Sequence, residues 1–213
     1  MDGSADCRYP PPSLDCGRML CGEELGASLD ATLAGHAGDG DLWIFGYGSL
    51  IWNPEFPVSE RLHARVHGYH RGLYLWSRVN RGTPEQPGLV LALDRGGSCG
   101  GVALRLSLSG DRARAHLEAL WRREMAMGSY RPAWLSCLLA DGRRVSALAF
   151  VIRRDINAYA GRLPDALVRT VFERATGGRY GSTLDYVQRT TAALREHGMP
   201  DHALEALLAR CAP

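Results

Sequence analysis

The chain has 213 residues, enough for one domain with a substantial hydrophobic core. Its 46% hydrophobic and 23% charged residues are typical of a globular protein, and its net charge of +2 is too small to indicate binding to nucleic acid or to an anionic membrane. All 25 basic residues are arginine, so no lysine side chain can form a Schiff base or serve in a phosphate loop.

The N-terminal part of the chain, residues 1–40, is rich in Gly, Pro and Asp. We expect it to be an extension, mobile or partly docked, with one short helix near residues 23–34 and the folded domain at 41–213. It has no pattern of basic then apolar residues like that of a signal peptide, and the six cysteines of the chain are scattered without a CxxC pair. These features favour a cytoplasmic protein with neither a disulfide framework nor a metal site.

From Asp41 onward, short apolar runs alternate with Gly, Pro, Asn or Asp, which is typical of strands. One helix is expected at residues 109–125, with Ser109 as its cap, and three more at 164–175, 183–196 and 201–210. Strands and helices do not alternate regularly, so a doubly wound sheet is not expected. The pattern predicts an α+β protein with a mostly antiparallel, curved sheet or barrel and a few packed helices. The runs read as strands are LWIF, ARVHGY, GLYLW, GLVLAL, GVALRL, AWLSCLL and VSALAFVI.

The segment GYGSLI, residues 46–51, interrupts an apolar run with two glycines. It begins like the dinucleotide motif GxGxxG, but Ile51 occupies the place of the third glycine, and no GK[ST] follows. A nucleotide loop is therefore not expected. The turn either redirects the chain or presents backbone amides to a ligand.

Two further motifs are not expected to form functional sites. GGSCG, residues 96–100, satisfies the GxSxG pattern of serine hydrolases with Ser98, but it lies between two predicted strands, so we expect a tight turn there and not a nucleophile elbow. His63, His67 and His70 lack a third, suitably placed ligand for a metal and are expected to be surface or hydrogen-bonded residues.

Glu124 is the carboxylate with the clearest chemical signal. It follows Leu117, Leu120 and Trp121 at helical spacing, so it should lie on the apolar face at the C-terminal end of its helix. Desolvation and the helix dipole would both raise its pKa toward values useful for proton transfer. The alternative is a partly buried glutamate paired with an arginine. Glu118 should point outward and pair with Arg122.

Four segments together resemble the ChaC family of γ-glutamylcyclotransferases: FGYGSLIWNPEFP, NRGTPEQPGLVLALDRGGSC, LWRREMAMGSYRPAW and GSTLDYV. Their order and spacing match the family from about Asp41 to Leu208. The resemblance implies a γ-glutamylcyclotransferase-like fold, a small curved β-barrel with packed helices. It also implies cleavage of reduced glutathione to 5-oxoproline and cysteinylglycine without a metal or cofactor.

The resemblance implies site residues as well. Glu124 matches the catalytic acid, and Tyr130 and Tyr186 match tyrosines that line the family's site. The substrate-binding turn corresponds to Tyr47, Gly48, Ser49 and Leu50. Arg81, in the NRGTPEQPG loop, could bind a substrate carboxylate or form a structural salt bridge.

Two other functions remain open at this stage. The same reaction could act on other γ-glutamyl amino acids or γ-glutamylamines, because the specificity pocket is not readable from the residues. The chain could also be a non-catalytic interaction protein that regulates a transporter, although such a module need not retain a desolvated acid. The expected partner is the small-molecule substrate glutathione, with no nucleic acid and no membrane, and the oligomeric state is not predicted.

Overall fold

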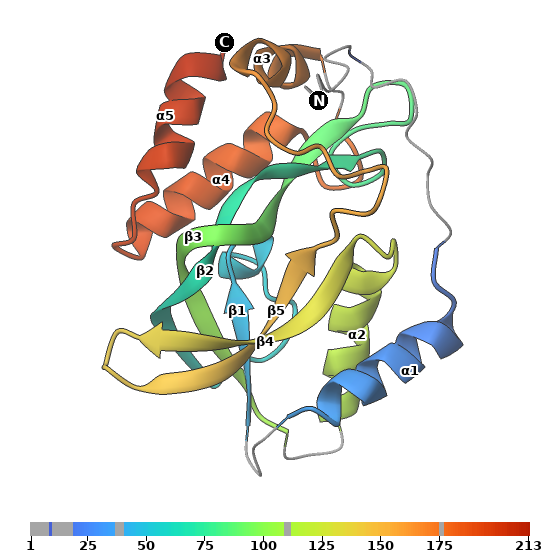
Figure 1. The fold of residues 1–213 in the computed structure, drawn as a ribbon, viewed down its shortest axis with the longest axis vertical. Helices are drawn as coiled ribbons and strands as arrows, with labels where there is room; N and C mark the ends of the chain where they lie inside the picture. The colour runs from blue at the N-terminus through green and yellow to red at the C-terminus, as the bar shows by residue number, and fades with distance from the viewer. Residues whose placement is uncertain (1–8, 10–18, 37–40, 109–111, 175–176) are drawn as a thin grey trace. The chain divides into compact units, whose positions relative to one another are not determined.

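The computed structural model describes residues 9, 19–36, 41–108, 112–174 and 177–213. Within these ranges it contains five strands, five α-helices and one 3-10 helix, η1 (Figure 1). None of the helices in the described ranges is long and apolar enough to cross a membrane. The strands are β1 (Leu42–Gly46), β2 (Glu60–Ser77), β3 (Gly88–Leu106), β4 (Tyr130–Leu139) and β5 (Arg144–Ile152). The helices are α1 (Gly22–Leu33), η1 (Ser49–Ile51), α2 (Ala113–Met125), α3 (Asp165–Arg174), α4 (Thr183–Glu196) and α5 (His202–Cys211).

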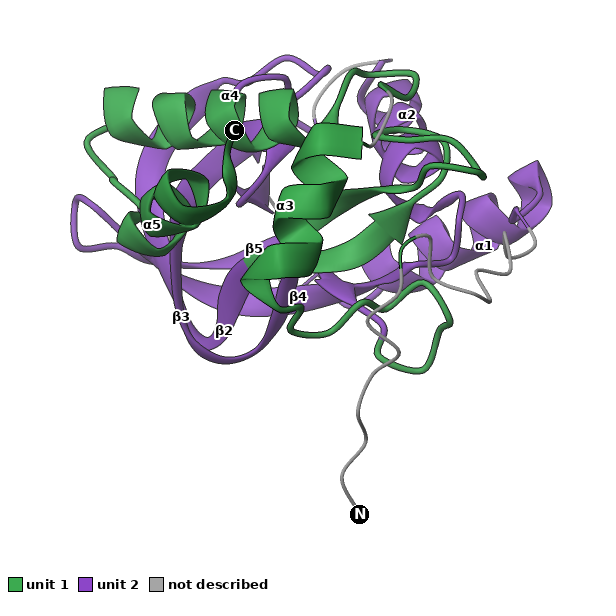
Figure 2. Ribbon diagram, turned by 90° about the horizontal axis from the view of Figure 1, so that it is seen from above, with its two compact units in different colours: residues 1–16, 72–92, 154–213 green, residues 17–71, 93–153 purple. Residues whose placement is uncertain are grey.

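The chain divides into two compact units, coloured separately in Figure 2. Unit 1 comprises residues 1–16, 72–92 and 154–213, and unit 2 comprises residues 17–71 and 93–153. Strands β2 and β3 each have residues in both units. Helices α3, α4 and α5 belong to unit 1, and α1, η1, α2, β1, β4 and β5 belong to unit 2.

The strands form a closed barrel in the order β1-β3-β2-β4-β5. β4 and β5 make a long antiparallel hairpin, from Tyr130 opposite Ile152 to Leu138 opposite Arg144 (Figure 1). β1 is antiparallel to β3 and parallel to β5, with Trp43 opposite Ala147, and this last pairing closes the barrel. Closure leaves the sheet no free edge of its own. The prediction of a mostly antiparallel barrel with packed helices is confirmed.

Successive side chains of a strand point alternately to the inside and the outside of the barrel. The inward-pointing apolar side chains form the core of unit 2. β5 is buried on both faces from Ala147 to Ile152, since α2 covers its outer side. There the Trp121 ring meets the Phe150 ring edge-on, with centroids 5.5 Å apart. The buried residues of the inner cluster are Trp43, Phe45, Tyr47, Ala64, Val66, Leu93, Cys99, Ala103, Leu135, Cys137, Leu139, Ala147, Ala149 and Val151.

Helix α1 lies in the region expected to be an extension, yet it packs against α2 within unit 2. Its buried residues are Leu25 and Leu29, and Asp30 forms an ion pair with Arg114 of α2. The backbone N–H of Leu20 donates to the carbonyl of Ala126, 2.8 Å away, so the chain before α1 is also joined to the end of α2. α2 is therefore covered by α1 on one side and supported by the barrel on another.

In unit 1, α4 is capped by Ser182, whose hydroxyl accepts from the Asp185 N–H in a capping box. The next residue, Thr183, is fully buried, and its hydroxyl accepts from the N–H of Leu89, 2.7 Å away. The start of β3 is thereby fixed to the first turn of α4. Gly88 lies so close to this contact that a Cβ there would meet the Arg81 carbonyl oxygen at 2.0 Å.

Two predicted breaks between strands are wrong. β2 runs without a break across residues 70–71, which separated the predicted strands ARVHGY and GLYLW, and β3 continues through the GGSCG segment, so Ser98 lies within one long strand and not in a turn. In β3 the reason is the glycines: Gly96 has φ +105° and Gly97 φ +70°, which bend the strand without ending it. No helix follows Ser98, so the nucleophile-elbow interpretation stays rejected.

Three further expectations, for Ser109, Glu118 and His70, have different outcomes. Ser109, the expected cap of α2, lies outside the described residues. Glu118 pairs with Arg114, four residues before it, at 2.8 Å, where the sequence had suggested Arg122. His70 is hydrogen-bonded as expected, with its Nδ1 2.9 Å from the Gly96 carbonyl oxygen.

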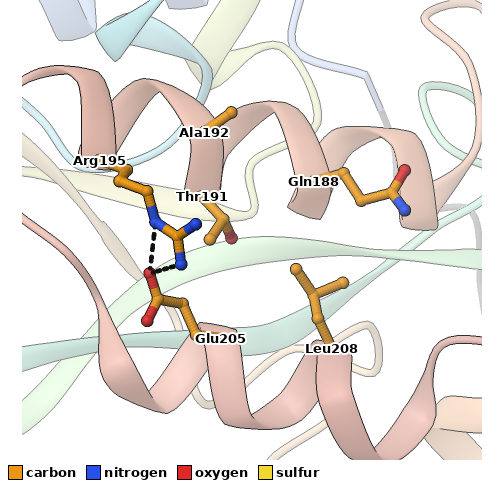
Figure 3. Close-up of a pocket in the computed structure, with 6 residues that line it drawn as sticks. All are labelled: Gln188, Thr191, Ala192, Arg195, Glu205 and Leu208. Atoms are coloured by element: carbon orange, nitrogen blue, oxygen red, sulfur yellow. Dashed lines mark hydrogen bonds and ion pairs between the residues drawn. The ribbon is translucent and has the colours of Figure 1, made fainter.

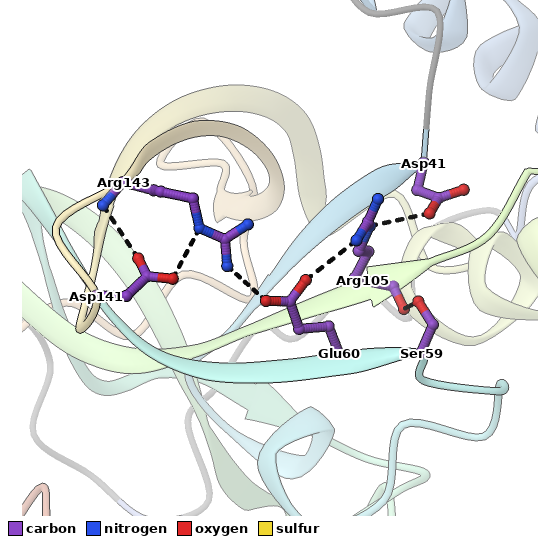
Figure 4. Close-up of polar contacts among 6 residues, drawn as sticks. All are labelled: Asp41, Ser59, Glu60, Arg105, Asp141 and Arg143. Carbon is purple, nitrogen blue, oxygen red and sulfur yellow. Dashed lines mark hydrogen bonds and ion pairs between the residues drawn. The ribbon is translucent and has the colours of Figure 1, made fainter.

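A chain of ion pairs joins several strand ends of the barrel (Figure 4). Glu60, at the start of β2, contacts both Arg105 of β3 and Arg143 of the β4–β5 turn, at 3.2 and 2.5 Å. Arg105 also reaches Asp41, just before β1, at 2.9 Å, and Arg143 reaches Asp141 at 2.7 Å. Because these side chains are partly exposed, the stabilisation from each pair is modest. Their main effect is to fix the register of strand ends that are distant in sequence.

Substituting Gly101 tests the close packing of β3 on β1. A Cβ at Gly101 would meet the Gly46 carbonyl oxygen at 2.4 Å and the Phe45 ring at 2.8 Å, whereas one at Gly100 has only the end of the Arg65 side chain within 4 Å. We expect Gly101→Ala to lower the free energy of unfolding by about 1–3 kcal/mol, measured by urea denaturation. Gly100→Ala is the matched control and should change it little. Equal effects of the two substitutions would contradict the packing described here.

Candidate functional site

The GYGSL segment forms a turn directly after β1. Tyr47 is buried, and its hydroxyl donates to the carbonyl of Phe150 on β5, 2.7 Å away. Its own carbonyl accepts from Arg71 of β2, 2.8 Å away. η1 then begins at Ser49, and the first amide bonded within it is that of Ile51, to the Gly48 carbonyl at 3.0 Å. The amides of Gly48, Ser49 and Leu50 precede that bond.

Glu124 lies in the last turn of α2, as predicted, on the face that buries Leu117, Leu120 and Trp121. Its side chain is only 16% exposed. Burial raises the pKa of Glu124, because the charged form loses hydration; the neighbouring Arg123 acts in the opposite direction, and the negative charge of Glu55 raises the pKa further. A carboxyl group whose pKa is raised in this way is better suited to proton transfer than an ordinary glutamate.

Arg123 connects this carboxylate to the turn. Its Nε lies 3.2 Å from Glu124 Oε1, and its Nη2 donates to Ser49 Oγ at 2.7 Å. Its Nη1 donates to the carbonyl of Asn53 at 2.6 Å and lies 3.4 Å from Glu55 Oε2. The turn after β1 and the end of α2, about 70 residues apart in sequence, are thereby held together by one side chain.

A second connection runs through the barrel wall. The Tyr47 hydroxyl is bonded to the Phe150 carbonyl, and the Phe150 ring packs edge-on against Trp121, one helical turn before Glu124. The turn and the helix end are thus fixed both by a polar contact through Arg123 and by an apolar one through Phe150. Two independent connections restrict the relative movement of the groups they join.

The remaining predicted site residues lie elsewhere in the chain. Tyr130, in unit 2, is the first residue of β4. Arg81 and Tyr186 lie together in unit 1: the Arg81 guanidinium is 4.5 Å from the centre of the Tyr186 ring and donates to the carbonyl of Tyr180. Both residues are buried, and only 5% of the surface of Arg81 is exposed. The two interpretations of Arg81, a partner for a substrate carboxylate and a structural salt bridge, stay predictions.

A cavity of about 280 Å³ also lies between α4 and α5 in unit 1 (Figure 3). It contains an ion pair between Arg195 and Glu205, at 2.8 Å. None of the predicted site residues lines it. The lining residues are Gln188, Thr191, Ala192, Arg195, Glu205 and Leu208.

Sequence reasoning missed two groups of the site, Arg123 and Glu55. Arg123 was only one of many arginines that could pair with Glu124, and nothing in its spacing marked it. Glu55 carries no apolar pattern, and its placement depends on a positive φ of 61° that is rare outside glycine. The expectation of a partly buried glutamate paired with an arginine is correct in its geometry, since Glu124 does pair with Arg123.

Nothing in the described part of the chain groups three or more His, Cys, Asp or Glu side chains as a metal site would require. What the arrangement around Glu124 offers is a carboxyl group with a raised pKa, paired with an arginine that joins it to the turn after β1. Such a set can transfer a proton and hold a developing negative charge on a carbonyl oxygen.

Comparison with known proteins gives relatives over most of the chain. A relative from Escherichia coli, a glutathione-specific γ-glutamylcyclotransferase, is 36% identical over 205 residues, which is 96% of this chain and 87% of the relative. A mouse relative named glutathione-specific γ-glutamylcyclotransferase 1 is 33% identical over 96% of this chain and 89% of its own length.

Solved structures show the same fold. A yeast γ-glutamyl cyclotransferase specific to glutathione superposes with a TM-score of 0.72 at 22% identity, over 81% of this chain and 96% of the yeast chain. The predicted γ-glutamylcyclotransferase-like fold is therefore confirmed. The family model described as ChaC-like protein matches residues 42–212. With that match and these relatives, the chain belongs to the ChaC-like family.

Proposed function

We propose that this protein is a glutathione-specific γ-glutamylcyclotransferase that converts reduced glutathione to 5-oxoproline and cysteinylglycine. The observation that carries the proposal is the buried Glu124 carboxyl group, held by Arg123 against the turn after β1. The activity of the bacterial and mouse relatives, as their names give it, supports the same substrate.

The chemistry needs one group that moves protons. The α-amine of the γ-glutamyl group attacks its own side-chain amide carbonyl, forming a C–N bond that closes a five-membered lactam. The C–N bond to the cysteine residue then breaks, and the leaving nitrogen needs a proton. Glu124 takes the proton from the attacking amine and delivers it to the leaving amine, so one carboxyl group serves both steps.

The turn would supply the electrostatic part of catalysis. Because nucleophile and electrophile belong to one molecule, the protein mainly has to hold the folded-back conformer of the substrate. The amides at Tyr47, Gly48, Ser49 and Leu50 are proposed to bind the oxygen that becomes negative as the ring closes. Ser49 is a binding and not a nucleophilic residue in this scheme, consistent with its hydroxyl being bonded to Arg123.

Tyr130 and Tyr186 are proposed to bind the substrate, by their match to the family motifs, and Arg81 is proposed to bind a substrate carboxylate as a bidentate partner. The proposed mechanism requires no cofactor, because the atoms and charges balance without one. A cytoplasmic location is proposed because reduced glutathione and the free thiols of Cys99 and Cys137 both belong to a reducing compartment.

The first test is the role of Glu124. We expect wild-type protein to release 5-oxoproline from reduced glutathione and Glu124→Gln to lower kcat by about 10²- to 10⁴-fold, because the amide cannot accept the proton. Product is measured by chromatography. Ser98→Ala is the control: Ser98 lies in β3 and contacts Arg65, so its loss should leave the rate unchanged. Full activity of Glu124→Gln would remove this residue from the mechanism.

A substrate panel tests specificity. We expect reduced glutathione to be turned over with a higher kcat/KM than γ-glutamyl dipeptides or γ-glutamylamines, measured with the same assay. A reversed order would keep the reaction and change the substrate. Absence of turnover on the whole panel would favour the non-catalytic interaction protein.

The dependence of stability on pH provides a test that needs no substrate. Because the pKa of Glu124 is raised in the folded protein, the folded state binds the proton more tightly than the unfolded state. Its contribution to stability is therefore lost as the pH rises from the ordinary glutamate pKa through the raised one. We measure the urea midpoint of Glu124→Gln minus that of wild type at two pH values. This difference should favour the variant more at neutral pH than at pH 4. A difference independent of pH would contradict the raised pKa.

A further inference from the structure

Arg123 uses every nitrogen of its guanidinium group. Nε faces Glu124 at 3.2 Å, Nη2 faces Ser49 Oγ at 2.7 Å, and Nη1 faces the Asn53 carbonyl at 2.6 Å and Glu55 at 3.4 Å. The side chain is 16% exposed, so these contacts are largely shielded from water. A planar fork can hold such partners in fixed directions, which a lysine ammonium on a flexible stem cannot do.

Glu55 is held in an unusual conformation on the other side of this arginine. Among the residues that the structure describes, it is the one non-glycine residue with a positive φ, 61°. A left-handed conformation is unfavourable for a residue with a Cβ, because the Cβ comes too close to the following carbonyl oxygen. Both carboxylate oxygens have partners: Oε1 accepts from Asn53 Nδ2 at 2.9 Å, and Oε2 faces Arg123. Strain of this kind persists where the surroundings require it, which is common at functional sites.

We propose that Arg123 and Glu55 form a pair of positioning residues, in which Glu55 holds the Arg123 guanidinium in place and Arg123 fixes the Glu124 carboxylate against the turn after β1. The inference rests on the proposed catalytic role of Glu124. It assigns to Arg123 and Glu55 no contact with the substrate. Their effect reaches the reaction only through the position and charge environment of Glu124.

The two residues act on Glu124 with opposite sign. Arg123 stabilises the ionised carboxylate and lowers the pKa of Glu124, while Glu55 raises it, both against a larger increase caused by burial. Elements packed around α2 and the turn carry further ionisable side chains, all unchanged in the variants below: Glu24 and Asp30 on α1, Arg61 on β2, Tyr130 and Arg131 on β4, and Arg153 after β5. The opposite signs give a prediction that a purely structural role does not.

The test measures kcat/KM for glutathione against pH. Glu124 must be ionised to act as a base, so activity falls on the acid side as the pH drops through its pKa. Arg123→Gln should move this acid limb to higher pH and lower kcat by about 10- to 100-fold through misplacement. Glu55→Gln, which keeps the shape of the side chain, should move the limb to lower pH. Arg123→Lys keeps the charge, so its limb should stay near that of wild type while kcat remains reduced.

Glu118→Gln is the matched control, because Glu118 is on the same helix and pairs with Arg114 away from the site. It should leave both kcat and the limb unchanged. The inference would be overturned if the acid limbs of Arg123→Gln and Glu55→Gln stayed at the wild-type position or moved in the same direction. The proposed function would still stand in that case, provided that the wild-type protein turns over glutathione. Should Arg123→Gln fail to fold, the Glu55→Gln limb decides alone, since Glu55 is 49% exposed.

A direct titration separates this inference from the proposed function. The carboxyl signal that disappears in Glu124→Gln is followed against pH by infrared difference spectroscopy in wild type, Arg123→Gln and Glu55→Gln. Opposite displacements of its midpoint support the pair even if glutathione is not turned over, a result that would overturn only the proposed function. Coincident midpoints in all three proteins would overturn the pair.

Discussion

The pairing of β1 on both of its sides is the constraint on which the candidate site depends. β1 has only five residues, all buried, and it lies between β3, to which it is antiparallel, and β5, to which it is parallel. The parallel contact closes the barrel, and it also fixes what the chain can do at Tyr47, directly after the strand. The turn starts beside β5, whose outer face is the one that α2 covers. The pairing of β1 with β5 therefore both closes the barrel and brings the turn close to the end of α2.

Burial of a carboxyl group at this place works against stability, and the neighbouring groups limit the loss. A fully uncompensated buried charge would be protonated or excluded from the interior. Arg123 partly compensates the charge of Glu124, yet it is itself shared with Ser49, Asn53 and Glu55. A dedicated ion pair with one arginine would hold the carboxylate ionised, as in an ordinary structural salt bridge. Sharing the arginine weakens that stabilisation of the charge, in keeping with the raised pKa of Glu124.

The sequence allowed the position of Glu124 to be predicted because helical periodicity is local: Leu117, Leu120 and Trp121 define the buried face without knowledge of the partner. The same local reasoning failed at Gly96–Gly97, where glycine was taken to end a strand and in fact bends it. Whether glycine ends or bends a strand depends on the neighbouring strands, which are distant in sequence. The contacts of Arg123 with Ser49 and Asn53 are non-local in the same way. The family motif located the helix end, but neither motif nor periodicity identified which arginine reaches the turn.

The adjacency of Arg123 and Glu124 in the last turn of α2 has a consequence for how the site tolerates change. Because the two residues are consecutive on one helix, a small displacement of that helix carries the Glu124 carboxylate and its counter-charge together. The distance from the carboxylate to groups off the helix would then vary, while its pairing with Arg123 would not. Substitutions in the packing beneath α2 could in this way adjust the position of the carboxylate without separating it from its neighbouring positive charge.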